Sequence, residues 1–158
     1  MNSLKNAFFL IIGLSIILWS FYAFLQKSAP VHYQNYIGRT YVVVGKNNIE
    51  VEIADTEEER AQGLSDKGTL ETGHGVLFIF DEPAKYGFWM KNMHFPIDIV
   101  WIDENWKVVG IERLINPNTY PKAFYPPDNI KYVLEIPAGE AQKYDIDIGQ
   151  FISYLQKK

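Results

Sequence analysis

Residues 40–53 read TYVVVGKNNIEVEI, and this stretch decides the fold class. Its first five residues are β-branched or aromatic, which favours a strand. Residues 45–48 have the composition of a turn, and residues 49–53 then alternate strictly between apolar side chains and glutamates. Such alternation directs the apolar side chains to one face of a strand and the glutamates to water. The stretch therefore predicts a β-hairpin that opens a mainly β domain.

More strand signals follow at short intervals along the chain. The apolar run VLFIF at residues 76–80 is typical of a strand buried on both faces. Thr56 and Glu59 form a capping box that predicts a short helix, and a second short helix is expected at residues 138–144. The other strands are expected at residues 86–90, 97–102, 107–114, 132–136 and 151–155. Many short strands suggest a compact barrel or sandwich, and we expect a small closed or half-closed antiparallel β-barrel with one or two short helices.

An apolar segment precedes this domain. Residues 7–25 carry no charge, and Lys5 and Lys27 flank them. A helix of that length rises roughly 28 Å, close to the hydrocarbon thickness of a bilayer. The run is longer than the core of a cleavable signal peptide, and bulky residues follow it. We therefore expect residues 1–29 to be a single transmembrane signal anchor and tether, with a cleaved signal peptide as the alternative.

The expected topology assigns a location to the remaining chain. Lys5 and the amino terminus favour the cytoplasmic side of the membrane. Residues 30–158 would then form a single β-barrel-like domain on the extracytoplasmic side, in the periplasm or at the cell surface. Residues 7–25 make the membrane itself an expected partner.

Composition excludes several classes of function. The chain has no cysteine, so it has no disulfide framework, thiolate metal site or cysteine nucleophile. Its net charge is −4, and taking away the two positive charges of Lys5 and Lys27 leaves −6 for the rest. An acidic domain argues against a nucleic-acid partner.

Five blocks of the sequence, taken in order, resemble one family. The most specific block is WMKN at residues 89–92, followed by a Pro-x-Asp motif at residues 96–98. The blocks lie at residues 52–64, 75–80, 88–92, 96–99 and 133–139. They are similar to domain-of-unknown-function family 192, an uncharacterised bacterial and archaeal family. The resemblance implies a small β-barrel-like fold, often behind an export signal, and it implies no established activity.

Two acids interrupt apolar strands in these blocks. Asp98 lies in the run of residues 97–102, and Glu135 lies between Leu134 and Ile136. A carboxylate in such a place must be paired or hydrogen-bonded, or its pKa rises. One interpretation is a binding pocket formed by Trp89, Lys91, Asn92, Asp98 and Glu135. The other is that these groups only satisfy backbone donors and lock the strand crossings.

Other candidate sites are weaker. His74 and His94 with Asp98 could form a metal site, but their spacing is not that of metal ligands, so we expect no metal and no cofactor. Residues 116–129 form a long connection rich in proline and aromatic residues. This loop could bind a sugar or cell-wall polymer, or it could cover one end of the barrel with its rings.

Three hypotheses on function remain open. The first is a membrane-anchored binding or accessory module with a pocket around residues 89–98, for an unknown small ligand or envelope component. The second is an envelope hydrolase or transferase that uses Asp98 and Glu135 as acid and base. The third is a structural or assembly partner. The sequence identifies no catalytic residue, and the small supply of titratable groups favours a role other than catalysis.

Overall fold

The computed structural model describes residues 39–156. The transmembrane segment expected at residues 7–25 lies outside this range. Within it, no helix is long and apolar enough to cross a membrane. The elements follow one another in the order β1 (Thr40–Val44), β2 (Asn47–Ala54), α2 (Glu57–Gln62), β3 (His74–Ala84), β4 (Phe88–Trp89), β5 (Ile97–Ile102), β6 (Val108–Ile115), a 3-10 turn (Pro117–Thr119), β7 (Ala123–Phe124), β8 (Ile130–Pro137), α3 (Glu140–Lys143) and β9 (Ser153–Gln156).

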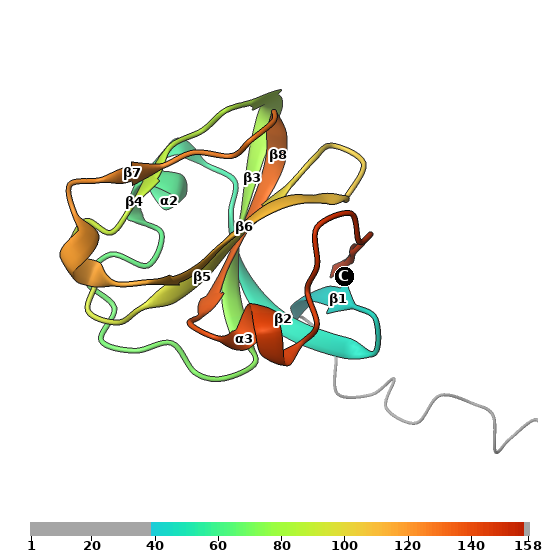
Figure 1. Cartoon of the computed structure of the whole chain (residues 1–158), viewed down its shortest axis with the longest axis horizontal. Helices are drawn as coiled ribbons and strands as arrows, with labels where there is room; N and C mark the ends of the chain where they lie inside the picture. The colour runs from blue at the N-terminus through green and yellow to red at the C-terminus, as the bar shows by residue number, and fades with distance from the viewer. Residues whose placement is uncertain (1–38, 157–158) are drawn as a thin grey trace, which may run out of the picture. The chain divides into compact units, whose positions relative to one another are not determined.

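Most strands belong to one sheet. Seven strands form it in the order β6-β5-β8-β3-β2-β1-β9, and β4 and β7 form a separate two-stranded pair (Figure 1). The two hairpins expected from the sequence, β1–β2 and β5–β6, are confirmed. Residues 86–90 form a strand only at Phe88–Trp89, which pairs with Ala123–Phe124 inside the long loop.

The expectation of a closed or half-closed antiparallel barrel was wrong. The sheet is mixed, because the connection through α2 returns the chain to the start of β3 and pairs β3 in parallel with β2. The sheet is also not closed. Near its β6 edge, residues 149–152 form three backbone hydrogen bonds with Trp106 and Val108, and Lys107 and Phe151 form an isolated bridge, but this segment adds no strand to the sheet.

The core divides between the two faces of the sheet. Strands β5 and β8 contribute to both faces because successive side chains of a strand point in opposite directions. Val100 and Leu134 belong to the core beside α3, whereas Trp101 and Val133 belong to the core beneath α2, β4 and β7. The run at residues 76–80 likewise divides between the faces, as the sequence predicted, with Leu77 in the first core and Phe78 in the second.

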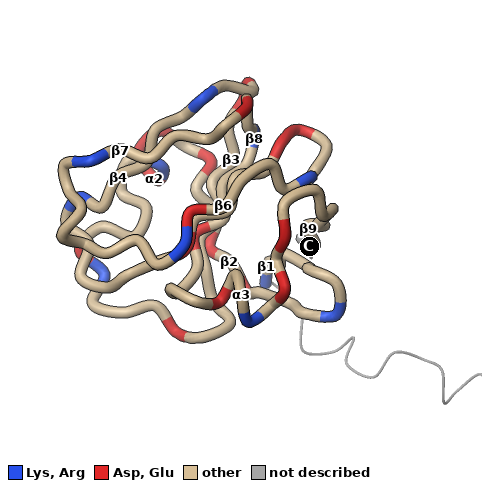
Figure 2. The backbone as a smooth tube through the Cα atoms, in the orientation of Figure 1, with Lys and Arg blue, Asp and Glu red and all other residues tan. Residues whose placement is uncertain are grey.

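Charged residues of both signs are spread over this framework. Figure 2 shows lysine or arginine as well as acidic residues around α2 and around α3. Helix α2 carries Glu57, Glu58 and Glu59 beside Arg60, and α3 carries Glu140 and Lys143. Neither helix therefore marks a region with charge of one sign.

Candidate ligand-binding site

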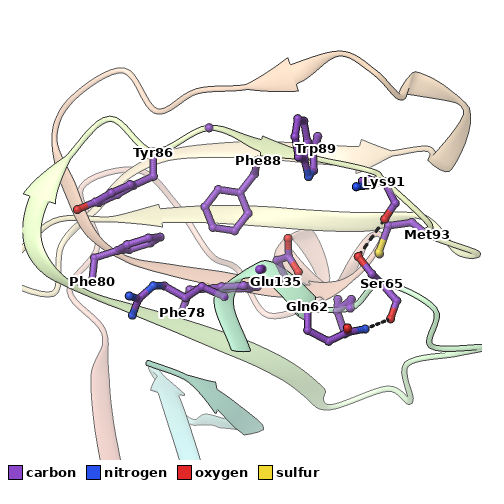
Figure 3. Close-up of a pocket in the computed structure, with 15 residues that line it drawn as sticks. Gln62, Ser65, Phe78, Phe80, Tyr86, Phe88, Trp89, Lys91, Met93 and Glu135 are labelled. Carbon is purple, nitrogen blue, oxygen red and sulfur yellow. Dashed lines mark hydrogen bonds between the residues drawn. The ribbon is translucent and has the colours of Figure 1, made fainter. Parts of the chain in front are cut away.

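A pocket with a volume of about 420 Å³ lies between α2 and the segment around β4 (Figure 3). Its walls come from α2 and the loop after it, from β3, from residues 86–93 and from β8. The lining residues are Arg60, Ala61, Gln62, Gly63, Leu64, Ser65, Phe78, Phe80, Tyr86, Gly87, Phe88, Trp89, Lys91, Met93 and Glu135. This volume is within the range of small-molecule sites in proteins.

Helix α2 is held in place by its own sequence. The Glu59 N–H donates to Oγ1 of Thr56, and the Thr56 N–H donates to the Glu59 side chain, so the predicted capping box is present. Arg60 then donates from Nη1 to the carbonyl oxygen of Ile79 at 2.9 Å and to that of Asp55. These bonds fasten α2 to β3 and form one wall of the pocket.

Aromatic rings form most of the opposite wall. The rings of Phe80 and Tyr86 are stacked with their centroids 3.6 Å apart. Phe88 packs edge-on against Phe78, with a centroid separation of 4.9 Å. Trp89 is 57% exposed, and the Lys91 Nζ lies 6.0 Å from the centre of its ring. Figure 3 shows Phe80 and Tyr86 at one end of the pocket and Lys91 at the other.

Glu135 lies between these two ends. Its strand is central in the sheet, where Glu135 is paired with Val76 of β3 and with Ile99 of β5. The side chain is 5% exposed and lines the pocket, and no described residue forms a hydrogen bond or ion pair with its carboxyl group. Burial raises the pKa of Glu135 to about 8, because the charged form is not solvated there. At neutral pH the group is therefore mostly a neutral carboxylic acid that can donate a hydrogen bond.

Asp98 has a different role. It is fully buried, and its two oxygens accept hydrogen bonds from the backbone N–H groups of Leu114, Gly139 and Ala141. Among the described residues it forms no ion pair with Lys91. Its surroundings match the interpretation in which the carboxylate satisfies backbone donors and locks the strand crossings.

The structure thus brings together three of the five residues expected at the site. Trp89, Lys91 and Glu135 line the pocket, whereas Asn92 and Asp98 do not. Asn92 is exposed and has φ 55°, a left-handed conformation that asparagine tolerates well. Its carbonyl oxygen accepts from the Asp66 N–H at 2.9 Å, so it holds the loop after α2.

Sequence reasoning missed most of the aromatic wall. The sequence predicts a buried strand that contains Phe78 and Phe80 and another strand that contains Tyr86 and Phe88, and nothing in it links either strand to Glu135. A signal was present, because side chains two positions apart point to the same face and Val76, Phe78 and Phe80 share that spacing. Only the pairing of Val76 with Glu135 places them around the acid.

The possible metal site does not form among the described residues. In residues 39–156 no group of three or more His, Asp or Glu side chains could hold a metal ion. His74 lies 3.8 Å from Glu50 at the surface, and neither His74 nor His94 lines the pocket.

In the long loop, Phe124 is buried while Tyr120 and Tyr125 are exposed, so only part of the loop fills the core.

Comparison with known proteins identifies the family. The model of domain-of-unknown-function family 192, described as "Uncharacterized ACR", matches residues 40–154. The chain belongs to this family. The resemblance inferred from the sequence blocks is thereby confirmed. A UPF0127 protein of Thermococcus gammatolerans is 27% identical over 106 residues, which cover 66% of this chain. The match spans 65% of the length of that relative.

Two solved structures share the fold of this family member. A candidate transcription regulator from Sinorhizobium meliloti 1021 has a TM-score of 0.68 and 25% identity, and the match covers 73% of this chain and 92% of that one. A protein of unknown function from Novosphingobium aromaticivorans DSM 12444 has a TM-score of 0.67 and 25% identity, covering 78% of this chain and 91% of that one. These likenesses support the mainly β fold and assign no ligand to the pocket.

Proposed function

We propose that this domain is a binding module that takes up a small molecule in the pocket between α2 and β4. The observation that carries the proposal is Glu135, a buried carboxyl group that lines the pocket without a partner among the described residues. Because its carboxyl group faces the pocket without a protein partner, Glu135 leaves its hydrogen-bonding capacity to whatever fills the pocket. A bound molecule that accepts a hydrogen bond from Glu135 would use this capacity.

Binding has better support than the alternative of an envelope hydrolase or transferase. That alternative needs Asp98 and Glu135 as an acid–base pair. Both oxygens of Asp98 are occupied by backbone N–H groups, and Asp98 does not line the pocket. Glu135 is the only carboxyl group among the described lining residues. Without a second carboxylate or a histidine in the described lining to act with it, Glu135 supports binding over catalysis.

We further propose that the module is tethered to a membrane by residues 7–25 and works on the extracytoplasmic side. The length and uncharged character of that segment support the tether. The net charge of −4 supports a partner other than nucleic acid, although one structural relative is named as a candidate transcription regulator. The tether predicts that the full chain stays in the membrane fraction after alkaline carbonate washing. Native protein whose amino terminus lies beyond Ala23 would contradict it.

A fragment screen on the full-length chain in nanodiscs tests the binding proposal. Any molecule that binds the native state raises the melting temperature. Ala61 lines the pocket and is exposed on α2, so Ala61→Trp fills the space without disturbing the core. We expect fragments that stabilise the wild-type protein but leave Ala61→Trp unaffected. A screen that yields no such fragment would refute the proposal.

A further inference from the structure

We propose that the ligand is an amphipathic organic anion, with an apolar body between the aromatic rings and a negative head group that meets Lys91 and the acid of Glu135. This inference rests on the proposed binding function and names the chemical class of its ligand. It is carried by the order of the groups along the pocket, by their charges and by the burial of Glu135.

One end of the pocket suits an apolar body. The stacked pair of Phe80 and Tyr86 lies there, with Phe88 beside it (Figure 3). Leu64 adds aliphatic surface to the lining. Flat apolar or aromatic groups gain both from burial and from contact with ring faces.

The other end of the pocket offers positive charge. Lys91 is exposed there, contacts Trp89 and forms no ion pair with a described residue. Ser65 and Gln62 add polar groups close to Lys91 (Figure 3). Arg60 does not belong to this end: its Cζ lies 5.3 Å from the centre of the Phe80 ring, and its Nη1 is already bonded to the carbonyl oxygens of Asp55 and Ile79.

Glu135 decides between an anion and a cation. The charged or titratable groups that line the pocket with it are Arg60 from α2 and Tyr86 and Lys91 from the segments flanking β4. The neighbouring strand residues Val76 and Ile99 are apolar. A neutral Glu135 leaves only positive charges in the lining at pH 7 and supplies a donor for a carboxylate oxygen. A cationic ligand would instead have to ionise Glu135 and approach two cations.

Three probes with one apolar body separate these possibilities. They are 3-phenylpropionate, 3-phenylpropan-1-ol and 3-phenylpropylammonium, titrated calorimetrically into the full-length chain in nanodiscs, with Ala61→Trp as the blank. At pH 6.5 we expect the anion to bind most tightly and the ammonium least. Because the anion needs the protonated acid, its affinity should fall above pH 8 by about tenfold per pH unit.

Two variants assign the effect to named residues. Lys91→Met should weaken binding of the anion by about threefold to fivefold and leave binding of the alcohol unchanged, because an exposed charge contributes little more than this to affinity. Lys122→Met is the matched control, because Lys122 lies over Phe124 outside the pocket lining. Glu135→Gln keeps a donor that cannot ionise, so it should bind the anion with no pH dependence near 8.

The outcomes distinguish this inference from the function on which it rests. Tightest binding of the ammonium, with an affinity that rises with pH, would overturn the anionic ligand and leave the binding function standing. Equal effects of Lys91→Met and Lys122→Met would overturn the assigned head-group position. If no probe binds the wild-type protein better than Ala61→Trp, the inference fails, and the fragment screen then decides whether the binding function fails with it.

Discussion

The backbone N–H of Leu114 donates to Oδ1 of Asp98 at a distance of 2.7 Å. Leu114 has φ 55°, and the register between β5 and β6 shifts at this point, so the bond closes an irregularity in β6. Oδ2 of Asp98 accepts from Gly139 and Ala141, both at 2.9 Å, where the chain leaves β8 and enters α3. One buried carboxylate thus fixes two separate chain crossings.

The first prediction concerns this carboxylate. In Asp98→Asn an NH2 group, which is a donor, replaces one acceptor oxygen and faces backbone N–H groups that are also donors. A hydrogen bond to a charged group contributes about 1.5–3 kcal/mol, and more than one bond is affected. We expect the free energy of unfolding to fall by about 2–4 kcal/mol, measured by urea denaturation of the full-length chain.

Lys91→Met supplies the control for that measurement. Lys91 is exposed and forms no ion pair with a described residue, so its replacement should change stability by less than about 0.5 kcal/mol. The double variant should show the sum of the two effects, because the residues share no contact. Recovery of stability in the double variant would mean that Asp98 and Lys91 form a buried pair after all.

Much of the fold could be predicted because it depends on local patterns. The alternation at residues 49–53 and the hairpin at residues 97–114 need only neighbouring residues to specify them. The parallel pairing of β2 with β3 could not be predicted in this way. It depends on how the connection through α2 returns across the sheet, and no period in the sequence encodes that path.

The site was predictable only in part for a related reason. Two buried acids could be recognised, because each interrupts an apolar strand. Their partners could not, because Asp98 bonds to backbone N–H groups that any residue type supplies. Glu135 has no partner from the described residues, and its aromatic neighbours come from β3 and from the segment around β4.

The second prediction tests the close approach of β3 and β8. A Cβ added at Gly75 would lie 2.6 Å from the carbonyl oxygen of Glu135, and backbone cannot move aside cheaply. Gly75→Ala should therefore lower the free energy of unfolding by about 1–3 kcal/mol. Gly68→Ala is the matched control, because an added Cβ there meets nothing within 4 Å, and it should be neutral or slightly stabilising. Equal stabilities of the two variants would contradict this packing.

The third prediction concerns the backbone at the β6 irregularity. Leu114 combines a left-handed φ with a side chain that is 66% exposed. Asparagine adopts that conformation more readily than leucine, and little burial is lost. Leu114→Asn should leave the free energy of unfolding unchanged or raise it by up to about 1 kcal/mol, as measured by urea denaturation. The adjacent Ile115 is 4% exposed, so Ile115→Asn should cost more than about 3 kcal/mol. A loss above about 1 kcal/mol in Leu114→Asn would show that its side chain makes a needed contact.

The last prediction concerns pH and Glu135. Burial raises the pKa of this carboxyl group from 4.5 to about 8 in the folded protein. Between these two values the folded state binds more protons than the unfolded state, so stability must fall as pH rises. Below pH 4.5 both states are protonated and above pH 8 both are ionised, so the contribution is constant outside this window. The total loss across it is on the order of 5 kcal/mol.

Glu135→Gln isolates this contribution from all other titrations. Glutamine has nearly the same shape and does not ionise, so its variant lacks the fall in stability between pH 4.5 and 8 that Glu135 causes. We therefore expect the difference in unfolding free energy, wild type minus Glu135→Gln, to decrease steadily through this window and to level off above it. Urea denaturation at pH 5, 6, 7, 8 and 9 measures the difference. A difference that stays constant with pH would mean that Glu135 is ionised in the folded protein, and the neutral donor assigned to the pocket would then be wrong.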